Sequence, residues 1–325
     1  GATRLDDVLD YVGGVSRQNN FGGLWDNIAI RGLPGNENTG MATLLNGFSS
    51  NRGFNAPRDL AGVERVEFLK GPAAALYGSS EPGGTLNIVS KKPLWKAAHS
   101  VEAYAGSYGL GRAALDTTGP INDRLAYRLN VAVEDKGSFR DHVRAQRQVV
   151  APAFTWKLSP DTVLEYTAEL LRHATPLDRG VVAVNNRLGA VPASRFLGEP
   201  ADGDVTVSNQ THQLVLSHEW NPDWRSRVGL SYRKTGLEGF STEATALQAN
   251  GRTLTRQRRF RDYQSDDVAV QAELQGNLRT GGLEHELLMG VESYRFSMDS
   301  VMLRANPSAA APYAIDIFNP VYGQA

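Results

Sequence analysis

The chain has 325 residues and a nearly balanced charge, with 34 Lys and Arg against 35 Asp and Glu, and it contains no cysteine. This balance argues against a nucleic-acid partner, which requires a basic excess, and the absence of cysteine excludes disulfides, thiolate metal sites and a cysteine nucleophile. No apolar run reaches the roughly 18 residues that a spanning helix needs, although membrane strands, which alternate apolar and polar residues, remain allowed.

The first part of the chain, to about residue 94, is rich in glycine and asparagine and has no sustained hydrophobic period. This pattern predicts a compact, loop-rich α+β domain. One or two helical turns are expected at 6–11, and short strands are expected at 27–31, 43–48, 63–70 and 85–90.

Glycine clusters surround Tyr77 in the stretch from Gly71 to Gly84. A phosphate-binding loop requires Gly-Lys-Ser/Thr at its end, whereas Ser79 stands where the lysine should be. Glycine and proline at these positions instead predict chain reversal and close backbone packing.

From about Lys96 the pattern changes to strict alternation of apolar and polar residues, which predicts antiparallel strands rather than helices. Tight turns are expected at 119–123, 158–161, 221–223 and 279–282, and long connections at 136–146, 174–210 and 237–259. Short turns at one end and long loops at the other are typical of bacterial outer-membrane barrels. A soluble sandwich or jelly roll is the alternative, but connections in compact domains are usually about four to six residues.

Several segments resemble the TonB-dependent outer-membrane receptors, in particular their ferric-siderophore branch. The segment "ERVEFLKGPAAALYGSSEPGGTLNIVSKKP" (64–93) is similar to the signature of their plug domain, and "LDDVLDYVGGVS" (5–16), "IAIRG" (28–32) and "LLNGF" (44–48) resemble other plug elements in the same order. Downstream, "LDTTGPINDRLAYRLNVAVED" (115–135) and "VAPAFTWKLSPDT" (150–162) resemble the second to fourth barrel strands.

The resemblance implies an antiparallel membrane β-barrel with an α+β plug domain inside its lumen. Residues 1–94 would form the plug and residues 95–325 part of the barrel. The family's plugged barrel has about 22 strands, whereas only about nine are expected here, so the chain is expected to be a fragment that also lacks the TonB-box segment and the first plug strands.

The resemblance also implies a function. The protein would be a receptor and not an enzyme, without a cofactor of its own, that binds a ferric siderophore at the cell surface and imports it into the periplasm. The energy would come from TonB and its inner-membrane complex, and outer-membrane lipid and lipopolysaccharide would be further partners. The alternatives are a receptor for haem, cobalamin or another chelate, and an outer-membrane barrel enzyme, which would need a catalytic cluster and no plug.

Carried over by position, the outward-facing plug loops are about 17–25, 34–41 and 49–56. Their polar and aromatic side chains are the candidates for binding the chelate, and about a third are expected to contact it. These candidates are Arg17, Asn19, Asn20, Trp25, Asn36, Glu37, Asn38, Arg52, Phe54 and Asn55. Arg31 and Lys70 are implied as a latch toward glutamates of the barrel wall.

The expected strand faces follow from the same resemblance. Leu129, Val131, Tyr166 and Leu230 should face lipid, and Arg128, Glu165, Glu169 and Arg227 should face the lumen.

Histidines and arginines offer two further possible sites. His212 and His218 would lie about 20 Å apart on one strand face, which excludes joint metal ligation, and the other histidines, His173 among them, are expected at barrel-surface or loop positions. The run "RQRRFR" (256–261) predicts either an anion site, for lipopolysaccharide phosphates or an anionic ligand, or a solvated strand start.

Overall fold

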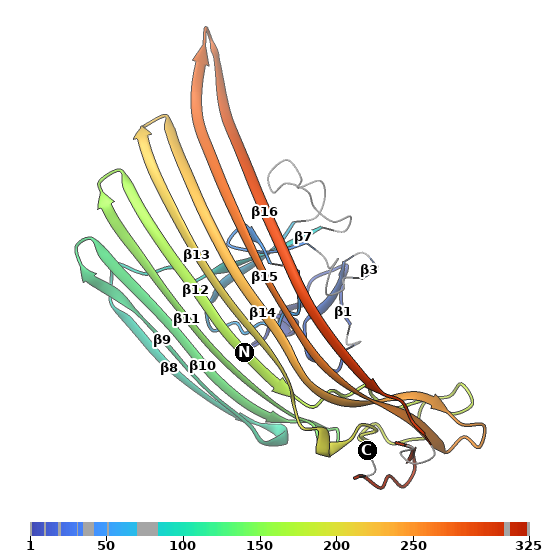
Figure 1. Ribbon diagram of the computed structural model, residues 1–325. Coiled ribbons are helices and arrows are strands. Elements are labelled where there is room, and N and C mark those ends of the chain that lie inside the picture. The colour runs from blue at the N-terminus through green and yellow to red at the C-terminus, as the bar shows by residue number, and fades with distance from the viewer. Residues whose placement is uncertain are drawn as a thin grey trace.

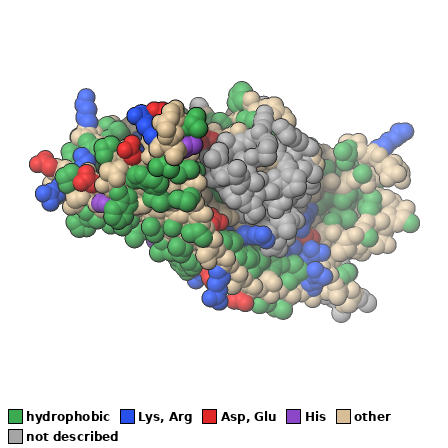
Figure 2. All heavy atoms as spheres, turned by 90° about the horizontal axis from the view of Figure 1, so that it is seen from above, with side chains coloured by type: hydrophobic (Ala, Val, Ile, Leu, Met, Phe, Trp, Pro, Cys, Tyr) green, Lys and Arg blue, Asp and Glu red, His purple; other side chains and the backbone are tan. Residues whose placement is uncertain are grey.

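The computed structural model describes residues 2–9, 11–18, 21–30, 32–34, 42–50, 52–69, 84–308 and 313–323. A long, curved antiparallel sheet lies against a smaller N-terminal domain (Figure 1). In the view from above, hydrophobic side chains form broad surface patches, and charged side chains stand out mainly at the periphery (Figure 2). No helix in the described part of the chain is long and apolar enough to cross a bilayer.

The N-terminal domain combines one short helix, α1 (Leu5–Leu9), with two small sheets, as the α+β prediction requires. Leu9 of this helix packs with Ile28, Leu45 and Ile88, so the helix and both sheets share one apolar core. The first sheet contains β1 (Val15–Gln18), β2 (Asn27–Ile30) and β3 (Leu33–Pro34), and the second, in the order β5-β4-β7-β6, contains β4 (Ala42–Leu45), β5 (Phe48–Ser49), β6 (Val63–Leu69) and β7 (Thr85–Ser90).

The large sheet places nine strands next to one another in chain order, and each pairs antiparallel with the next. The prediction of about nine barrel strands is thereby confirmed. They are β8 (Ala98–Gly106), β9 (Leu110–Asn122), β10 (Leu125–Gly137), β11 (Arg144–Ser159), β12 (Thr162–Thr175), β13 (Val205–Asn221), β14 (Trp224–Leu247), β15 (Thr253–Thr280) and β16 (Leu283–Ala305). A short strand, β17 (Ile315–Asp316), pairs with β15.

The connections differ between the two ends of this sheet. Tight turns join β9 to β10, β11 to β12, β13 to β14 and β15 to β16 at the upper edge in Figure 1, as expected. The opposite end carries the long connection between β12 and β13. The long loop expected at 237–259 is wrong, because β14 and β15 stay paired up to Leu247 and Leu254.

One face of the sheet is apolar and exposed, and the other meets the small domain. Leu230 and Val270, a cross-strand pair, are both more than 40% exposed. On the other face, Glu169 contacts Arg58 and Glu165 contacts Lys92. The small domain therefore packs on the polar face, as predicted.

Five further residues fit the predicted division of faces. The Arg128 guanidinium donates to the Lys92 carbonyl at 3.0 Å, and the Arg227 guanidinium lies 5.7 Å from the ring of Phe48 in β5. Leu129, Val131 and Tyr166 are offset by an odd number of positions from these inward residues on their strands, and so face away from the small domain.

Candidate functional site

An aromatic cluster joins the N-terminal domain to the sheet near its long-loop end. The rings of Phe21 and Trp25 are stacked with centroids 4.8 Å apart, and Trp25 lies 5.2 Å from Phe54. Phe54 in turn stacks on Tyr263 of β15 at 5.0 Å. Between Phe21 and Trp25, Gly22 has φ +63° and approaches the backbone of the long β12–β13 connection so closely that a Cβ would lie 2.8 Å from its atoms. The cluster is therefore fixed from both sides.

Two predicted site residues, Trp25 and Phe54, meet in this cluster. Phe54 is only 4% exposed, so the expectation of an exposed contact side chain is wrong for it. Its ring is buried because it packs between Trp25, Tyr263 and the other apolar side chains of the same core cluster. Trp25 is only partly buried and remains a candidate for direct contact.

Arg52 and Asn55 form hydrogen bonds that hold the loop around Phe54 in place. The Arg52 carbonyl accepts a hydrogen bond from Arg233 at 2.6 Å, and the Asn55 side chain bonds to Arg233 and to the Arg52 and Gly53 carbonyls. The remaining candidates fall outside the described residues: Asn19, Asn20, Asn36, Glu37 and Asn38, the side chain of Arg17, and the latch residues Arg31 and Lys70.

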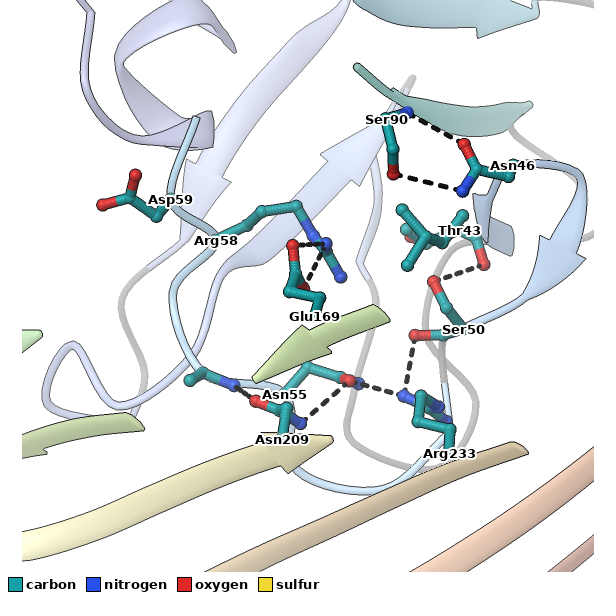
Figure 3. Close-up of polar contacts among 12 residues, drawn as sticks. Thr43, Asn46, Ser50, Asn55, Arg58, Asp59, Ser90, Glu169, Asn209 and Arg233 are labelled. Atoms are coloured by element: carbon teal, nitrogen blue, oxygen red, sulfur yellow. Dashed lines mark hydrogen bonds and ion pairs between the residues drawn. The ribbon is translucent and has the colours of Figure 1, made fainter. Parts of the chain in front are cut away.

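Two side chains of the sheet hold the backbone of residues 50–56. Arg233, bonded to Asp267, donates to the Ser50 carbonyl at 3.0 Å as well as to the Arg52 carbonyl. Asn209 accepts from the Ala56 N–H at 2.7 Å and donates to the Phe54 carbonyl at 3.1 Å. Figure 3 shows both side chains reaching the loop from neighbouring strands. Side chains of β13 and β14 in the large sheet, called the wall below, thus set the position of Phe54.

The sequence did not single out Arg233 or Asn209. Alternation predicts only that both lie on a polar face. The loop residues that they hold, Ala56 and Ser50, are more than 150 positions away in the chain. Arg233 and Asp267 stand directly opposite each other across β14 and β15, so the strand register was the signal that could have found this ion pair.

A second polar contact joins the small domain to the large sheet, at Asp59. Asp59 of the small domain accepts hydrogen bonds from Arg112 at 2.7 and 2.8 Å and from Arg147 at 2.9 Å, and all three side chains are at most 4% exposed. Burial alone would raise the pKa of Asp59, but the two guanidinium groups outweigh it and hold the pKa below its ordinary value. One guanidinium nitrogen of the neighbouring Arg58 donates to both carboxylate oxygens of Glu169, at 2.7 and 2.9 Å (Figure 3).

A cavity of about 610 Å³ separates the small domain from the wall. Side chains of both charges face it, from the loop after β4, from β6 and β7, and from the strands β12 to β16. Those with charged or polar ends include Asn46, Arg65, Lys92, Glu165, Thr167, Arg227, Glu273 and Glu292.

The described histidines do not form a metal site. In the described part of the chain, no group of three or more His, Cys, Asp or Glu side chains is arranged to hold a metal ion. His212 and His218 bond to Tyr166 and Thr162 at 2.8 Å. His173 is 2% exposed on the inner face of β12, so the expected surface or loop position is wrong for it. It is buried because the small domain covers that part of the strand.

Comparison with known proteins adds independent findings. The protein-family model described as TonB-dependent Receptor Plug Domain matches residues 1–85. The chain is 46% identical over 326 residues to the metal-pseudopaline receptor CntO of Pseudomonas aeruginosa, covering 99% of this chain and 45% of that protein. It is 27% identical to the ferrioxamine receptor of Yersinia enterocolitica, covering 95% of this chain and 44% of that protein.

Among solved structures, BauA, the ferric preacinetobactin receptor of Acinetobacter baumannii, matches with a TM-score of 0.86 at 19% identity, covering 99% of this chain and 49% of that one. The catecholate import receptor Fiu of Escherichia coli in its closed form matches with a TM-score of 0.83 at 24% identity, covering 99% of this chain and 48% of that one. These likenesses show the fold. The chain spans a little under half the length of the curated relatives cited above.

Proposed function

The chain belongs to the TonB-dependent receptors of the bacterial outer membrane, as a plug domain followed by part of the barrel, and we propose that the receptor containing it binds a metal chelate at the cell surface and transports it into the periplasm. The division into a plug at 1–94 and a barrel at 95–325 is part of this proposal.

The observation that carries the proposal is the plug loop at 50–56, which the large sheet holds by hydrogen bonds. Arg233 and Asn209 of the large sheet fix the backbone of residues 50–56, and Phe54 of this loop packs against Trp25, which stacks on Phe21. Rigid aromatic rings offer large contact areas at low entropic cost, which suits the organic shell of a chelate.

The ligand class follows from the relatives. One is named as a receptor for metal-pseudopaline and another as a receptor for ferrioxamine. A siderophore-like metal chelate is therefore the proposed ligand. Such a ligand fills the coordination sphere of its metal, so the receptor needs contacts to the organic shell only. TonB and its inner-membrane complex are the proposed source of energy.

Uptake assays test this function. A strain lacking the receptor would be complemented with the full-length gene and supplied with radiolabelled metal-pseudopaline or ferric ferrioxamine. Complementation should restore uptake of at least one chelate, and a tonB deletion or a protonophore should abolish it. Equal uptake with and without the receptor gene would refute the proposal.

A further inference from the structure

The arginine-rich run at 256–261 divides between the two faces of β15. Arg256, fully buried, pairs with Glu199 at 3.4 Å, and Arg258 pairs with Asp202 at 2.8 Å. Both acidic partners belong to the long connection between β12 and β13. These two arginines therefore fasten an outer loop to the strand.

Arg259 and Arg261 lie on the other face, which they share with Tyr263 of the aromatic cluster. Both reach the carboxylate of Glu243 on β14, at 3.1 and 2.6 Å, and Arg179 of the long connection reaches the same carboxylate at 2.8 Å. Glu243 is 3% exposed, so three guanidinium groups converge on one buried carboxylate. Among the described residues, Glu243 is the carboxylate that these three guanidinium groups share, so it is surrounded by positive charge.

A fourth arginine increases this charge. Arg304 of β16 stands directly opposite Arg259 in the ladder, and like charges at that position destabilise a sheet. The described part of the chain offers Arg304 no carboxylate partner; its Nε contacts the Met302 sulfur at 3.1 Å. The arrangement costs stability in the ligand-free protein, and an anion between the two side chains would relieve the repulsion.

The arginines adjoin the proposed chelate surface. The guanidinium groups of Arg179 and Arg261 lie 4.8 and 5.3 Å from the centre of the Phe21 ring, which stacks on Trp25. Arg261 is 3% exposed and bonds to Ser241, so it is held in place, whereas Arg259 is 22% exposed and its side chain is accessible.

We propose that Arg259, which shares Glu243 with the two arginines at the Phe21 ring, and Arg304, opposite it on β16, form an anion subsite that binds a carboxylate of the incoming chelate. This proposal rests on the proposed function and names the charge of its ligand. Guanidinium binds carboxylate through two parallel hydrogen bonds, which fixes orientation as well as charge. Lipopolysaccharide phosphates are excluded as the ligand because Arg259 faces the lumen with Tyr263, whereas lipid lies outside the wall.

Equilibrium binding to the full-length receptor in detergent tests the subsite with two probes. The probes are metal-pseudopaline and ferric ferrioxamine B, the ligands for which two relatives are named. The subsite predicts that loss of the arginines weakens binding of a chelate that carries carboxylates and leaves binding of a chelate without them unchanged. The variants are Arg259→Gln, Arg304→Gln and Arg259→Lys. The matched control is Arg258→Gln, which removes the same charge one position away on the opposite face of the strand.

Arg259→Gln and Arg304→Gln should each weaken metal-pseudopaline binding by about tenfold, the scale of a lost charge-assisted hydrogen bond. They should also flatten its salt dependence, and Arg259→Lys should restore part of the affinity. Arg258→Gln should bind metal-pseudopaline like the unmodified receptor. Because it also breaks the ion pair with Asp202, the melting temperature of every variant is measured to separate a loss of stability from a loss of binding.

If Arg259→Gln and Arg258→Gln changed the affinity for metal-pseudopaline equally, the proposed subsite would be wrong. The proposed function would be unaffected. The same conclusion would follow if the unmodified receptor bound only ferric ferrioxamine B and Arg259→Gln had no effect. Failure of the unmodified receptor to bind either chelate would refute the proposed function, and the subsite with it.

Discussion

Asp59 is the residue whose loss should most weaken the contact between plug and wall. Arg112 and Arg147 are at most 4% exposed, so Asp59→Asn would leave two buried guanidinium groups facing mainly Glu134. Removing one partner of a buried ion pair costs about 3–5 kcal/mol. We expect a loss of that size in the free energy of unfolding, measured by urea titration of the detergent-solubilised receptor.

Asp135→Asn is the matched control for Asp59→Asn. Asp135 also pairs with an arginine of the wall, Arg144, but their side chains are 36% and 66% exposed. Exposed pairs contribute about 0–1 kcal/mol, so the control should lose little stability. Equal losses in the two variants would show that Asp59 does not hold the plug.

Asp26 should make the plug sensitive to pH. Burial raises the pKa of its carboxyl from the ordinary 3.8 to about 6, against the opposing charge of Arg4 and a hydrogen bond from the Arg58 N–H. Because the folded pKa lies above the unfolded one, this stabilising contribution is complete below about pH 4 and is lost as pH rises through 6. Asp26→Asn does not titrate, so it should gain stability relative to the unmodified receptor by up to about 3 kcal/mol between pH 4 and 7.

Unfolding free energies of both proteins at pH 4, 5.5 and 7 measure this effect. A difference between them that stays constant across these pH values would mean that Asp26 is not protonated in the folded plug near pH 5.

At the scale of the strands, a substituted charge should distinguish the two faces of the wall. Leu214, 41% exposed on the outer face of β13, lies opposite Tyr166 of β12, and Thr167 next to it faces the cavity. Leu214→Arg should cost about 2–4 kcal/mol because it places charge in lipid near mid-membrane. Thr167→Arg should cost less than about 1 kcal/mol, because its side chain enters a polar cavity.

Folding of both variants into lipid vesicles, followed by urea titration, gives these values. Equal costs for Leu214→Arg and Thr167→Arg would contradict the assignment of the faces.

The sequence predicted elements well where the deciding signal was local. Strand alternation and the tight turns depend on neighbouring residues, and both are found. The loop expected at 237–259 is wrong because the inner positions there are polar, such as Ser241 and Glu243. Their strand conformation depends on the ladder with β15, which pairs Ser241 with Arg259 and Glu243 with Gln257. Local alternation carries no information on that pairing.

The site was less predictable, for the same reason. The resemblance named the plug loops and pointed to Trp25 and Phe54, but the burial of Phe54 depends on Tyr263, more than 200 positions away. The hydrogen bonds of Arg233 and Asn209 to the loop at 50–56 likewise exist only once the sheet has formed. The predicted latch of Arg31 and Lys70 lies outside the described residues and remains a prediction.

At the scale of the whole molecule, contacts of different chemistry hold the plug to the wall. The aromatic cluster and Arg233 act near the long loops, and Phe48 packs on Val215 and Ala269 of the wall. Asp59 contacts Arg112 of β9 and Arg147 of β11. Buried ion pairs fix a geometry while adding little net stability compared with apolar packing, so a plug held in this way is well positioned and needs less work to move.

A disulfide between plug and wall should separate binding from transport. A Cβ placed on Gly62 would lie 3.0 Å from the Cβ of Ala151 on β11, and disulfides need about 3.5–4.5 Å, so a small backbone shift accommodates Gly62→Cys with Ala151→Cys. The chain has no other cysteine. The oxidised receptor should bind the chelate normally, because the aromatic cluster is untouched, but should not import it until a reductant opens the bond. The two single-cysteine variants are the controls. Full transport by the oxidised double variant would show that the plug need not leave this part of the wall.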